Sequence, residues 1–296
     1  MTAAPIETMY VQSYADNVTL LLQQKESRLE RAVTTGNYKG EAASPVEQVG
    51  AIAAQKNGGR GQQVRPIEAP TDRPWVYPED YNLPQHVYGV DKLRMVVDPT
   101  SAFNVNAAQA MRRAKDDEIV AAFFADRKTG KSGGTTTSFL AANQVSVNVG
   151  GTASGMNVAK LRKGKQLLMS YDLDEDEEIF CAINSIQHDN LLNEVQIISS
   201  DFNGSEKPVL VDGKVTRFLG VNFIHLERLP VNGSSYRRVP MWAKSGMHLG
   251  IWNDIKNDIT QRKDIEGLPY QLYTEMTLGA TRLEEKKVIE LPCAES

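Results

Sequence analysis

A stretch near the front of the chain is too poor in large apolar side chains to fold by itself. Between Glu30 and Pro70 the sizeable apolar residues are Val33, Tyr38, Val46, Val49, Ile52, Val64 and Ile67. The remainder cannot bury enough surface to offset the entropy of ordering the chain. Leu29–Val33 and Val46–Val49 nevertheless alternate as strands do. We therefore predict an extended arm that folds well only when it lies on another surface.

A long, strongly amphipathic helix is predicted after the arm, over residues 100–125. Asp98-Pro-Thr-Ser101 is a typical helix start, with Thr100 or Ser101 as the N-cap. Apolar residues then recur at helical spacing from Phe103 to Phe124. At 1.5 Å per residue this helix would be about 38 Å long. An arm followed by one long helix indicates a building block rather than a catalyst.

Composition and charge narrow the class of protein. The 296 residues are 41% hydrophobic and 24% charged, so one large or two modest domains with a real core are expected. The 33 basic and 37 acidic residues give a net charge of −4, which argues against a protein that coats nucleic acid by bulk charge. Cys181 and Cys293 lack the spacing of a disulfide framework or a metal site, which favours folding in a reducing cytoplasm. We see no secretory signal and no apolar run near the roughly 18 residues that span a bilayer.

The remaining pattern predicts an α+β class, with helices first and most strands later. Helices are expected at Ser13–Lys25 and Asn157–Tyr171, and a mobile loop or hairpin at Gly130–Gly155. Strands are expected at 197–200, 208–211, 215–229, 236–242, 256–262, 270–278 and 287–291.

Ala125–Ser132 resembles a loose nucleotide-binding P-loop, with Ala in place of the first Gly. A true P-loop has a strand before it and a helix after it, so that helix N-terminal amides meet the phosphate. Here a helix precedes the motif and Gly-Gly-Thr-Thr-Thr follows it, so a flexible loop is the preferred interpretation. An NTPase that uses Lys131 and Ser132 stays as an alternative.

Other motifs have simple structural interpretations. Asp172–Asp176 has the spacing that opens a calcium loop, but the turn glycine and the bidentate Glu are missing, which favours a solvated acidic turn. None of the four histidines lies three or four residues from another, and no nucleophile elbow is present. We therefore expect no catalytic residue, no metal site, no cofactor and no enzymatic activity.

Two basic clusters, at 112–115 and 160–165, and the spaced arginines Arg60, Arg65 and Arg73 are interpreted as solvated faces or as salt links to neighbouring copies. DNA binding through the second cluster is a further alternative, although the net acidity counts against it.

Several stretches resemble one known family. They are residues 14–25, Pro70-Thr-Asp-Arg-Pro-Trp75, Asp91-Lys-Leu-Arg94, Asp98-Pro-Thr-Ser101, 111–124 and 279–286. On these residues the chain resembles the major capsid proteins of tailed bacteriophages with the Hong-Kong-97-type fold. The resemblance covers most of the chain and follows the order of the family's parts.

The resemblance implies a domain plan and a function. The plan is an N-terminal arm (1–27), an extended E-loop (28–74), a P-domain (75–155 and 255–296) with a spine helix at about 100–125, and an A-domain (156–254). The implied function is a major capsid (head) protein that self-assembles into hexamers and pentamers of an icosahedral shell around double-stranded DNA. The candidate inter-subunit contacts are Val46, Val49, Ile52, Arg60, Arg65 and Arg73. The runner-up is a decoration or tail structural protein of the virion.

The implied partners are further copies of the chain, a portal, a decoration protein and packaged DNA in weak, non-specific proximity, with no membrane. The implied location is the virion capsid, assembled in the host cytoplasm. A separate scaffolding protein is expected because the chain has no room for the helical scaffolding segment of some members. No covalent cross-link is expected, because no activating carboxylate stands beside Lys39, Lys56 or Asn57 in the sequence.

Overall fold

The structure is a computed structural model that describes residues 23–56, 63, 66–88, 100–149, 151–194, 210–211 and 214–295. The chain divides into two compact units. Unit 1 comprises Met1–Glu26, Asp80–Arg113 and Asn253–Met276, and unit 2 comprises Ser27–Glu79, Ala114–Trp252 and Thr277–Ser296. Among the described residues, no helix combines the length and the apolar content that a membrane-spanning segment needs.

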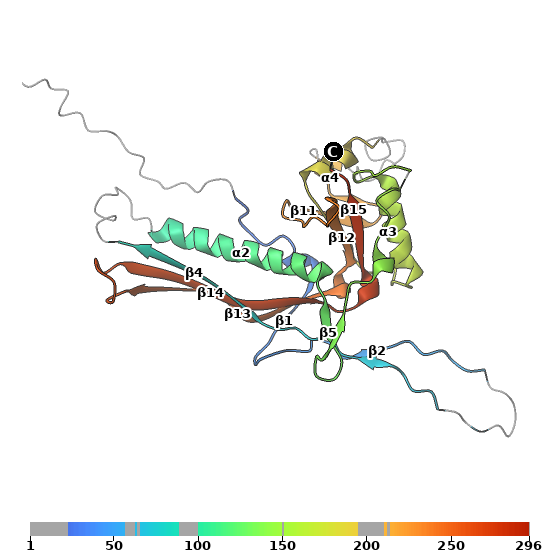
Figure 1. Cartoon of the computed structure of the whole chain (residues 1–296), viewed down its shortest axis with the longest axis horizontal. Coiled ribbons are helices and arrows are strands. Elements are labelled where there is room, and N and C mark those ends of the chain that lie inside the picture. The colour runs from blue at the N-terminus through green and yellow to red at the C-terminus, as the bar shows by residue number, and fades with distance from the viewer. Residues whose placement is uncertain are drawn as a thin grey trace, which may run out of the picture. The chain divides into compact units, whose positions relative to one another are not determined.

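Strands stand both before and after the long helix, and the last third of the described chain is mostly strands (Figure 1). The α-helices of the described residues are α2 (Thr100–Phe124), α3 (Val158–Ser170) and α4 (Ser185–Leu192). The 3-10 helices are η2 (Glu30–Ala32), η3 (Ala141–Asn143), η4 (Lys244–Gly246) and η5 (Glu285–Lys287). The strands are β1 (Thr34–Asn37), β2 (Gln48–Val49), β3 (Thr71–Asp72), β4 (Glu79–Val87), β5 (Arg127–Thr129), β6 (Thr135–Thr137), β7 (Ile179–Ile183), β8 (Leu210–Val211), β9 (Lys214–Val215), β10 (Arg217–Phe218), β11 (Val221–His225), β12 (Arg237–Ala243), β13 (Met247–Gln261), β14 (Tyr270–Arg282) and β15 (Val288–Cys293).

The strands form two larger sheets. One has the order β1-β13-β14-β4, and the other has the order β10-β11-β7-β12-β15. In the second sheet β7 runs parallel to β11 and antiparallel to β12, which in turn pairs antiparallel with β15. The predicted closing strands are confirmed as β13, β14 and β15, and the predicted helix at 157–171 is α3. The predicted strand at 197–200 and most of the predicted helix at 13–25 lie outside the described residues.

The predicted long helix is confirmed as α2, but its buried face is not purely apolar. Ala107, Met111, Ile119 and Phe123 are buried at the spacing of one helical face. Asp116 is fully buried as well, so the expectation of a strongly amphipathic helix is wrong in this respect. The physical reason is that the Asp116 carboxylate binds residues 27–29 through hydrogen bonds.

Asp116 holds the segment that enters unit 2. Its carboxylate accepts hydrogen bonds from the Ser27 hydroxyl (2.7 Å), the Arg28 N–H (3.0 Å) and the Leu29 N–H (3.1 Å). The buried carboxylate thus satisfies the backbone N–H groups of Arg28 and Leu29 and the Ser27 hydroxyl.

Residues 29–33 do not form the strand-like start of an arm that the sequence predicted. Glu30–Ala32 is the 3-10 helix η2, and Leu29, Ala32 and Val33 are buried. The Ala32 carbonyl accepts a hydrogen bond of 2.8 Å from the indole of Trp242, a fully buried side chain of β12. The apolar residues of this segment therefore belong to the core of unit 2.

Helix α3 packs closely against the five-stranded sheet because residue 164 has no side chain. A Cβ atom at Gly164 would lie 3.0 Å from the Leu291 side chain of β15 and 3.1 Å from the Met241 sulfur of β12. The same packing corrects the interpretation of 160–165 as a uniformly solvated basic cluster. Lys160 is fully buried, and its ammonium donates to the carbonyls of Ser154 and Pro292.

A buried arginine caps the end of α2. Arg282 of β14 is fully buried and donates from Nη1 to the carbonyls of Ala122 (3.0 Å), Phe123 (2.9 Å) and Ala125. The last carbonyls of a helix have no intrahelical donors and carry partial negative charge, so a cation is favourable there. The Glu285 carboxylate lies 3.1 Å from the Arg282 guanidinium and balances its positive charge. Burial lowers the pKa of Arg282, and the Glu285 carboxylate opposes that shift.

We predict that Arg282→Met lowers the free energy of unfolding by roughly 3 kcal/mol, because the helix carbonyls and Glu285 lose a buried charged partner. Urea unfolding followed by circular dichroism measures this. Arg262→Met is the matched control, because Arg262 pairs with Asp264 at the surface. Equal midpoints for both variants would contradict the capping role.

A second ionic cluster joins α4 to β12. The Glu295 carboxylate accepts from Arg237 (2.9 and 2.7 Å), from the α4 N-cap Asn184 (2.6 Å) and from Gln187 (2.9 Å). The Arg237 hydrogen bond, helped by the two amides, lowers the pKa of Glu295 to about 2 from its ordinary value of 4.5, against the opposing effect of desolvation.

Glu295 should therefore contribute acid-sensitive stability. The contribution is complete well above pH 4.5 and is lost as the pH falls toward 2, because in this range the unfolded chain takes up a proton that the folded state does not yet bind. After allowance for solvent screening, its size is about 1–2 kcal/mol. Denaturant unfolding between pH 5 and 2.5 should show a shallower loss of stability in Glu295→Gln than in the unchanged protein. Glu175→Gln, at an exposed position, should follow the unchanged protein, and identical slopes for all three proteins would refute the assignment.

Candidate functional site

The exposed arm of unit 2 begins at a short segment whose two sides are paired by backbone hydrogen bonds, and we call this segment the root. The Ala43 and Val76 backbones exchange hydrogen bonds of 3.0 and 2.8 Å. The strands β2 and β3 then pair antiparallel, with Gln48 opposite Asp72. The Gly50 N–H donates to the Pro70 carbonyl at 2.7 Å. Residues 51–56, 63 and 66–69, which follow on both sides, have no secondary structure.

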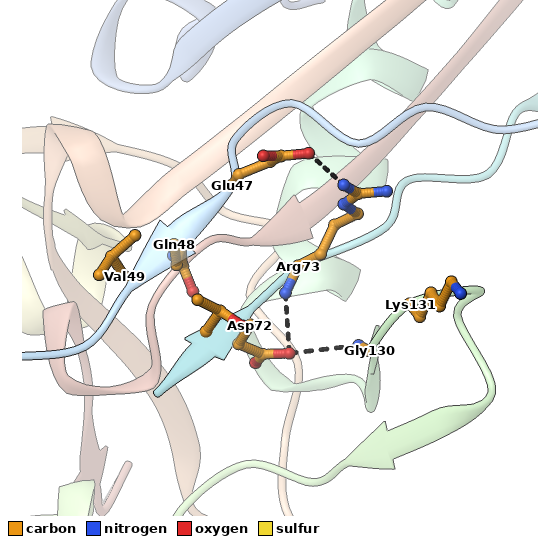
Figure 2. A pocket seen from close by; sticks show the side chains of 8 residues that line it. Glu47, Gln48, Val49, Asp72, Arg73, Gly130 and Lys131 are labelled. Atoms are coloured by element: carbon orange, nitrogen blue, oxygen red, sulfur yellow. Dashed lines mark hydrogen bonds and ion pairs between the residues drawn. The ribbon is translucent and has the colours of Figure 1, made fainter. Parts of the chain in front are cut away.

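Asp72 is the centre of the root. Its Oδ1 accepts from the Arg73 N–H at 2.8 Å and from the Gly130 N–H at 3.2 Å (Figure 2). Its Oδ2 lies 3.5 Å from the guanidinium of Arg127. The carboxylate therefore ties β3 to the β5–β6 hairpin.

The root is connected to the α2 cap by alternating charges. Arg127 lies 3.1 Å from Glu285, and Glu285 lies 3.1 Å from Arg282. On the other side, Arg73 pairs with Glu47 of the opposite arm strand. Arg127 and Glu285 are mostly buried, so their attraction is screened less than that of a surface pair. We call Arg282, Glu285, Arg127 and Asp72 the root network.

A pocket of about 460 Å³ lies at the root, and Figure 2 shows its lining. It is lined by Glu47, Gln48, Val49, Thr71, Asp72, Arg73, Gly130 and Lys131. Gly130 and Lys131 belong to the turn between β5 and β6, so a strand rather than a helix follows the P-loop-like motif. The Gly130 N–H already donates to the Asp72 carboxylate, and this negative charge stands where a P-loop would hold phosphate.

The candidate contact residues are the exposed apolar side chains of the arm. Val49 is 68% exposed, Ile52 58% and Val46 43%. Ile67, on the returning side, is 43% exposed. The structure thus brings Val49 and Arg73 together at the root and places Val46 and Ile52 on either side of β2. Arg60 and Arg65 lie outside the described residues.

Sequence reasoning missed the residues that hold the root. From the sequence, Gly130 is predicted only as part of a flexible loop, and no structural role is predicted for Asp72. The one available signal was Asp72 within Pro70-Thr-Asp-Arg-Pro-Trp75, since Asp before a backbone turn often accepts from nearby N–H groups. Trp75 is similarly engaged, because its indole donates to the Gly130 carbonyl at 2.7 Å.

The remaining candidate motifs have structural roles. Within the described part of the chain, no cluster of His, Cys, Asp and Glu could hold a metal ion. His188 accepts from the Val215 N–H at 3.3 Å. His248 lies between Thr34 (2.8 Å) and Tyr38 (2.9 Å), and burial lowers the pKa of His248 to about 4. The buried imidazole is therefore neutral near pH 7.

The chain is similar to known capsid proteins over its whole length. The model of a family described as phage capsid protein matches residues 6–295. No curated protein sequence matches. Among solved structures, the capsid of cyanophage P-SCSP1u has a TM-score of 0.76 at 15% identity, covering 100% of this chain and 96% of that chain.

Two other solved capsids are comparably similar. The capsid of cyanophage Pam1 has a TM-score of 0.76 at 11% identity and covers 99% of each chain. The capsid of Ralstonia phage GP4 has a TM-score of 0.73 at 9% identity, covering 100% of this chain and 98% of that chain. These likenesses confirm the predicted Hong-Kong-97-type capsid fold.

Asp72→Ala should loosen the root without unfolding unit 2. The change removes the acceptor of the Gly130 N–H and the charged partner of Arg127, and a hydrogen bond to a charged group contributes about 1.5–3 kcal/mol. We expect hydrogen exchange at Gly130 to accelerate roughly tenfold and residues 51–69 to be cleaved faster by protease. Glu68→Ala, an exposed change within the arm itself, is the control. Unchanged exchange in Asp72→Ala would show that the root does not depend on this carboxylate.

Proposed function

This chain belongs to the phage capsid protein family, and from that membership we propose that it is the major capsid protein of its shell. Copies form six- and five-membered rings, and the rings close into an icosahedral shell around double-stranded DNA. The observation that supports this proposal most directly is a firmly held root that carries exposed apolar side chains with no cover in their own subunit.

The arm is proposed to complete its folding on a neighbouring copy. Fully burying one Val or Ile side chain contributes about 1.5–3 kcal/mol. Val46, Val49, Ile52 and Ile67 together would therefore contribute about 6–12 kcal/mol, which offsets part of the entropy lost when the arm is ordered. Arg60, Arg65 and Arg73 are proposed to add charge pairs that set the geometry of the contact.

The length of the arm fits this role. Between Gly50 and Pro70 the chain has 19 residues, nine on each side of Arg60. At roughly 3.3 Å per residue, an extended hairpin of that length reaches about 30 Å. That distance is comparable with the width of a small domain, so the tip would reach onto a neighbouring subunit.

The domain plan is also part of the proposal. It comprises the N-terminal arm (1–27), the E-loop (28–74), the P-domain (75–155 and 255–296) and the A-domain (156–254). Because Leu29, Ala32 and Val33 belong to the core of unit 2, the part of the E-loop that is available to a neighbour begins beyond them. A separate scaffolding protein, a portal and a decoration protein are the proposed partners, with assembly in the host cytoplasm.

A structural rather than catalytic role is proposed. The family is one of structural capsid proteins. The P-loop-like motif is a strand-to-strand turn, and its Gly130 N–H is occupied by Asp72. Both observations count against the NTPase alternative. We propose no cofactor and no covalent cross-link between subunits.

Val49→Asp combined with Ile52→Asp should abolish assembly while leaving the subunit folded, because both side chains are exposed in the isolated chain. The concentration at half-assembly should rise by at least about tenfold for each residue. Sedimentation velocity and negative-stain electron microscopy of the purified protein measure this. Val49→Ile with Ile52→Val is the matched control, since it keeps the apolar surface.

Two results would overturn parts of this proposal. An unchanged chain that stays a compact monomer at every salt and protein concentration, with and without scaffold, would favour a decoration or tail component. Normal shells from the double Asp variant would retain the shell function but remove these side chains from the contact.

A further inference from the structure

A shallow groove of about 470 Å³ runs along the outer side of α3. It is lined by Arg162, Lys165, Gln166, Met169, Ser170 and Leu219. The five helical residues follow the spacing of a single helix face, while Leu161, Gly164 and Leu168 on the opposite face are buried. The groove is therefore a continuous stripe that the core of unit 2 does not use.

Leu219 is held at the edge of this groove in an unfavourable backbone conformation. It has φ +51 in the two-residue turn Leu219-Gly220 between β10 and β11, where Asn or Gly is usual. A left-handed residue other than glycine costs of order 1–3 kcal/mol, and such residues gather at functional sites. Lys165 fixes the turn by donating to the Leu219 carbonyl at 2.7 Å.

The groove offers positive charge beside apolar surface. Arg162 is exposed and has no ion pair or hydrogen bond from its side chain to any described residue. Met169 is 59% exposed. An occupant that matches this surface carries carboxylates next to an aliphatic group.

The same chain carries such a segment in the turn that follows α3. Asp174, Glu175 and Asp176 are exposed, and their carboxylates have no partner among the described residues. The next two acidic residues differ, because Glu177 lies 3.7 Å from Lys287 and Glu178 lies 3.7 Å from Lys244. Leu173 supplies an aliphatic group beside the unpaired carboxylates.

We propose that the α3 groove of one copy receives the acidic turn 173–176 of a second copy. The inference rests on the proposed shell function and names a contact within the rings. Two different patches of the same chain meet, so the contact is heterologous, and a heterologous contact repeated around an axis closes a ring. The charges set partner choice and register more than total affinity.

The first test is charge reversal at the groove. Arg162→Glu should raise the protein concentration at half-assembly roughly tenfold, with an unchanged circular dichroism spectrum. Lys163→Glu is the matched control, because Lys163 lies on the same helix but outside the groove lining. Asp174→Arg with Asp176→Arg should impair assembly like Arg162→Glu.

A variant with reversed charges at both the groove and the acidic turn tests whether these two surfaces contact each other. A chain that carries Arg162→Glu, Asp174→Arg and Asp176→Arg together should recover assembly. A one-to-one mixture of the groove variant and the turn variant satisfies every contact only when the two alternate. The mixture should therefore form six-membered rings but not five-membered rings.

The outcomes separate this inference from the proposed function. If the unchanged chain forms no ring or shell, the proposed function fails, and this contact fails with it. If the unchanged chain assembles and Arg162→Glu assembles equally well, only the groove contact is overturned. Impaired assembly without recovery in the triple variant would assign the groove to another partner and refute the contact. If Arg162→Glu assembles normally but binds duplex DNA more weakly than the unchanged chain, in a salt-dependent way, the groove is a nucleic-acid surface instead.

Discussion

The arm root depends on the hydrogen bonds that Arg282 donates to the last carbonyls of α2. The guanidinium satisfies carbonyls that the helix itself leaves open. The balancing Glu285 also holds Arg127, and Arg127 holds Asp72. A single alternating series of charges therefore runs from a buried helix end to the base of an exposed arm, and each member satisfies the next.

The division between root and tip has a physical logic. The Asp72 carboxylate is paired with the Arg73 and Gly130 N–H groups and with Arg127 within one subunit, so the direction in which the arm leaves is set before any partner arrives. The apolar groups further along, such as Val49 and Ile52, are left exposed. A preorganised base reduces the entropy lost on association, while the exposed side chains supply the hydrophobic contribution only in the assembled state. The proposed groove on α3 would add charge selectivity to that contact.

The predictions from periodicity and composition are correct where neighbouring residues alone decide the secondary structure. The helix over 100–125, the helix after Asn157 and the closing strands all depend on patterns visible within a short window. The resemblance to capsid proteins, not the composition, singled out Val46, Val49 and Ile52, and all three side chains are exposed in the single subunit. In contrast, Leu29–Val33 was misread as part of the arm, because its alternation is the same whether its partner is a neighbour or Trp242 of its own subunit.

The sequence by itself determined the α+β class, the long helix, the uncovered arm and, through its resemblance, the capsid fold. These features rest on local periodicity and composition. Only the tertiary structure decided that Asp116, Lys160 and Arg282 are buried, that Asp72 holds Gly130, and that the P-loop-like motif is a turn between strands. The reason is that a charged residue becomes part of a core only when segments distant in the sequence bring it partners. Arg282, for example, lies about 160 positions from the carbonyls that it caps.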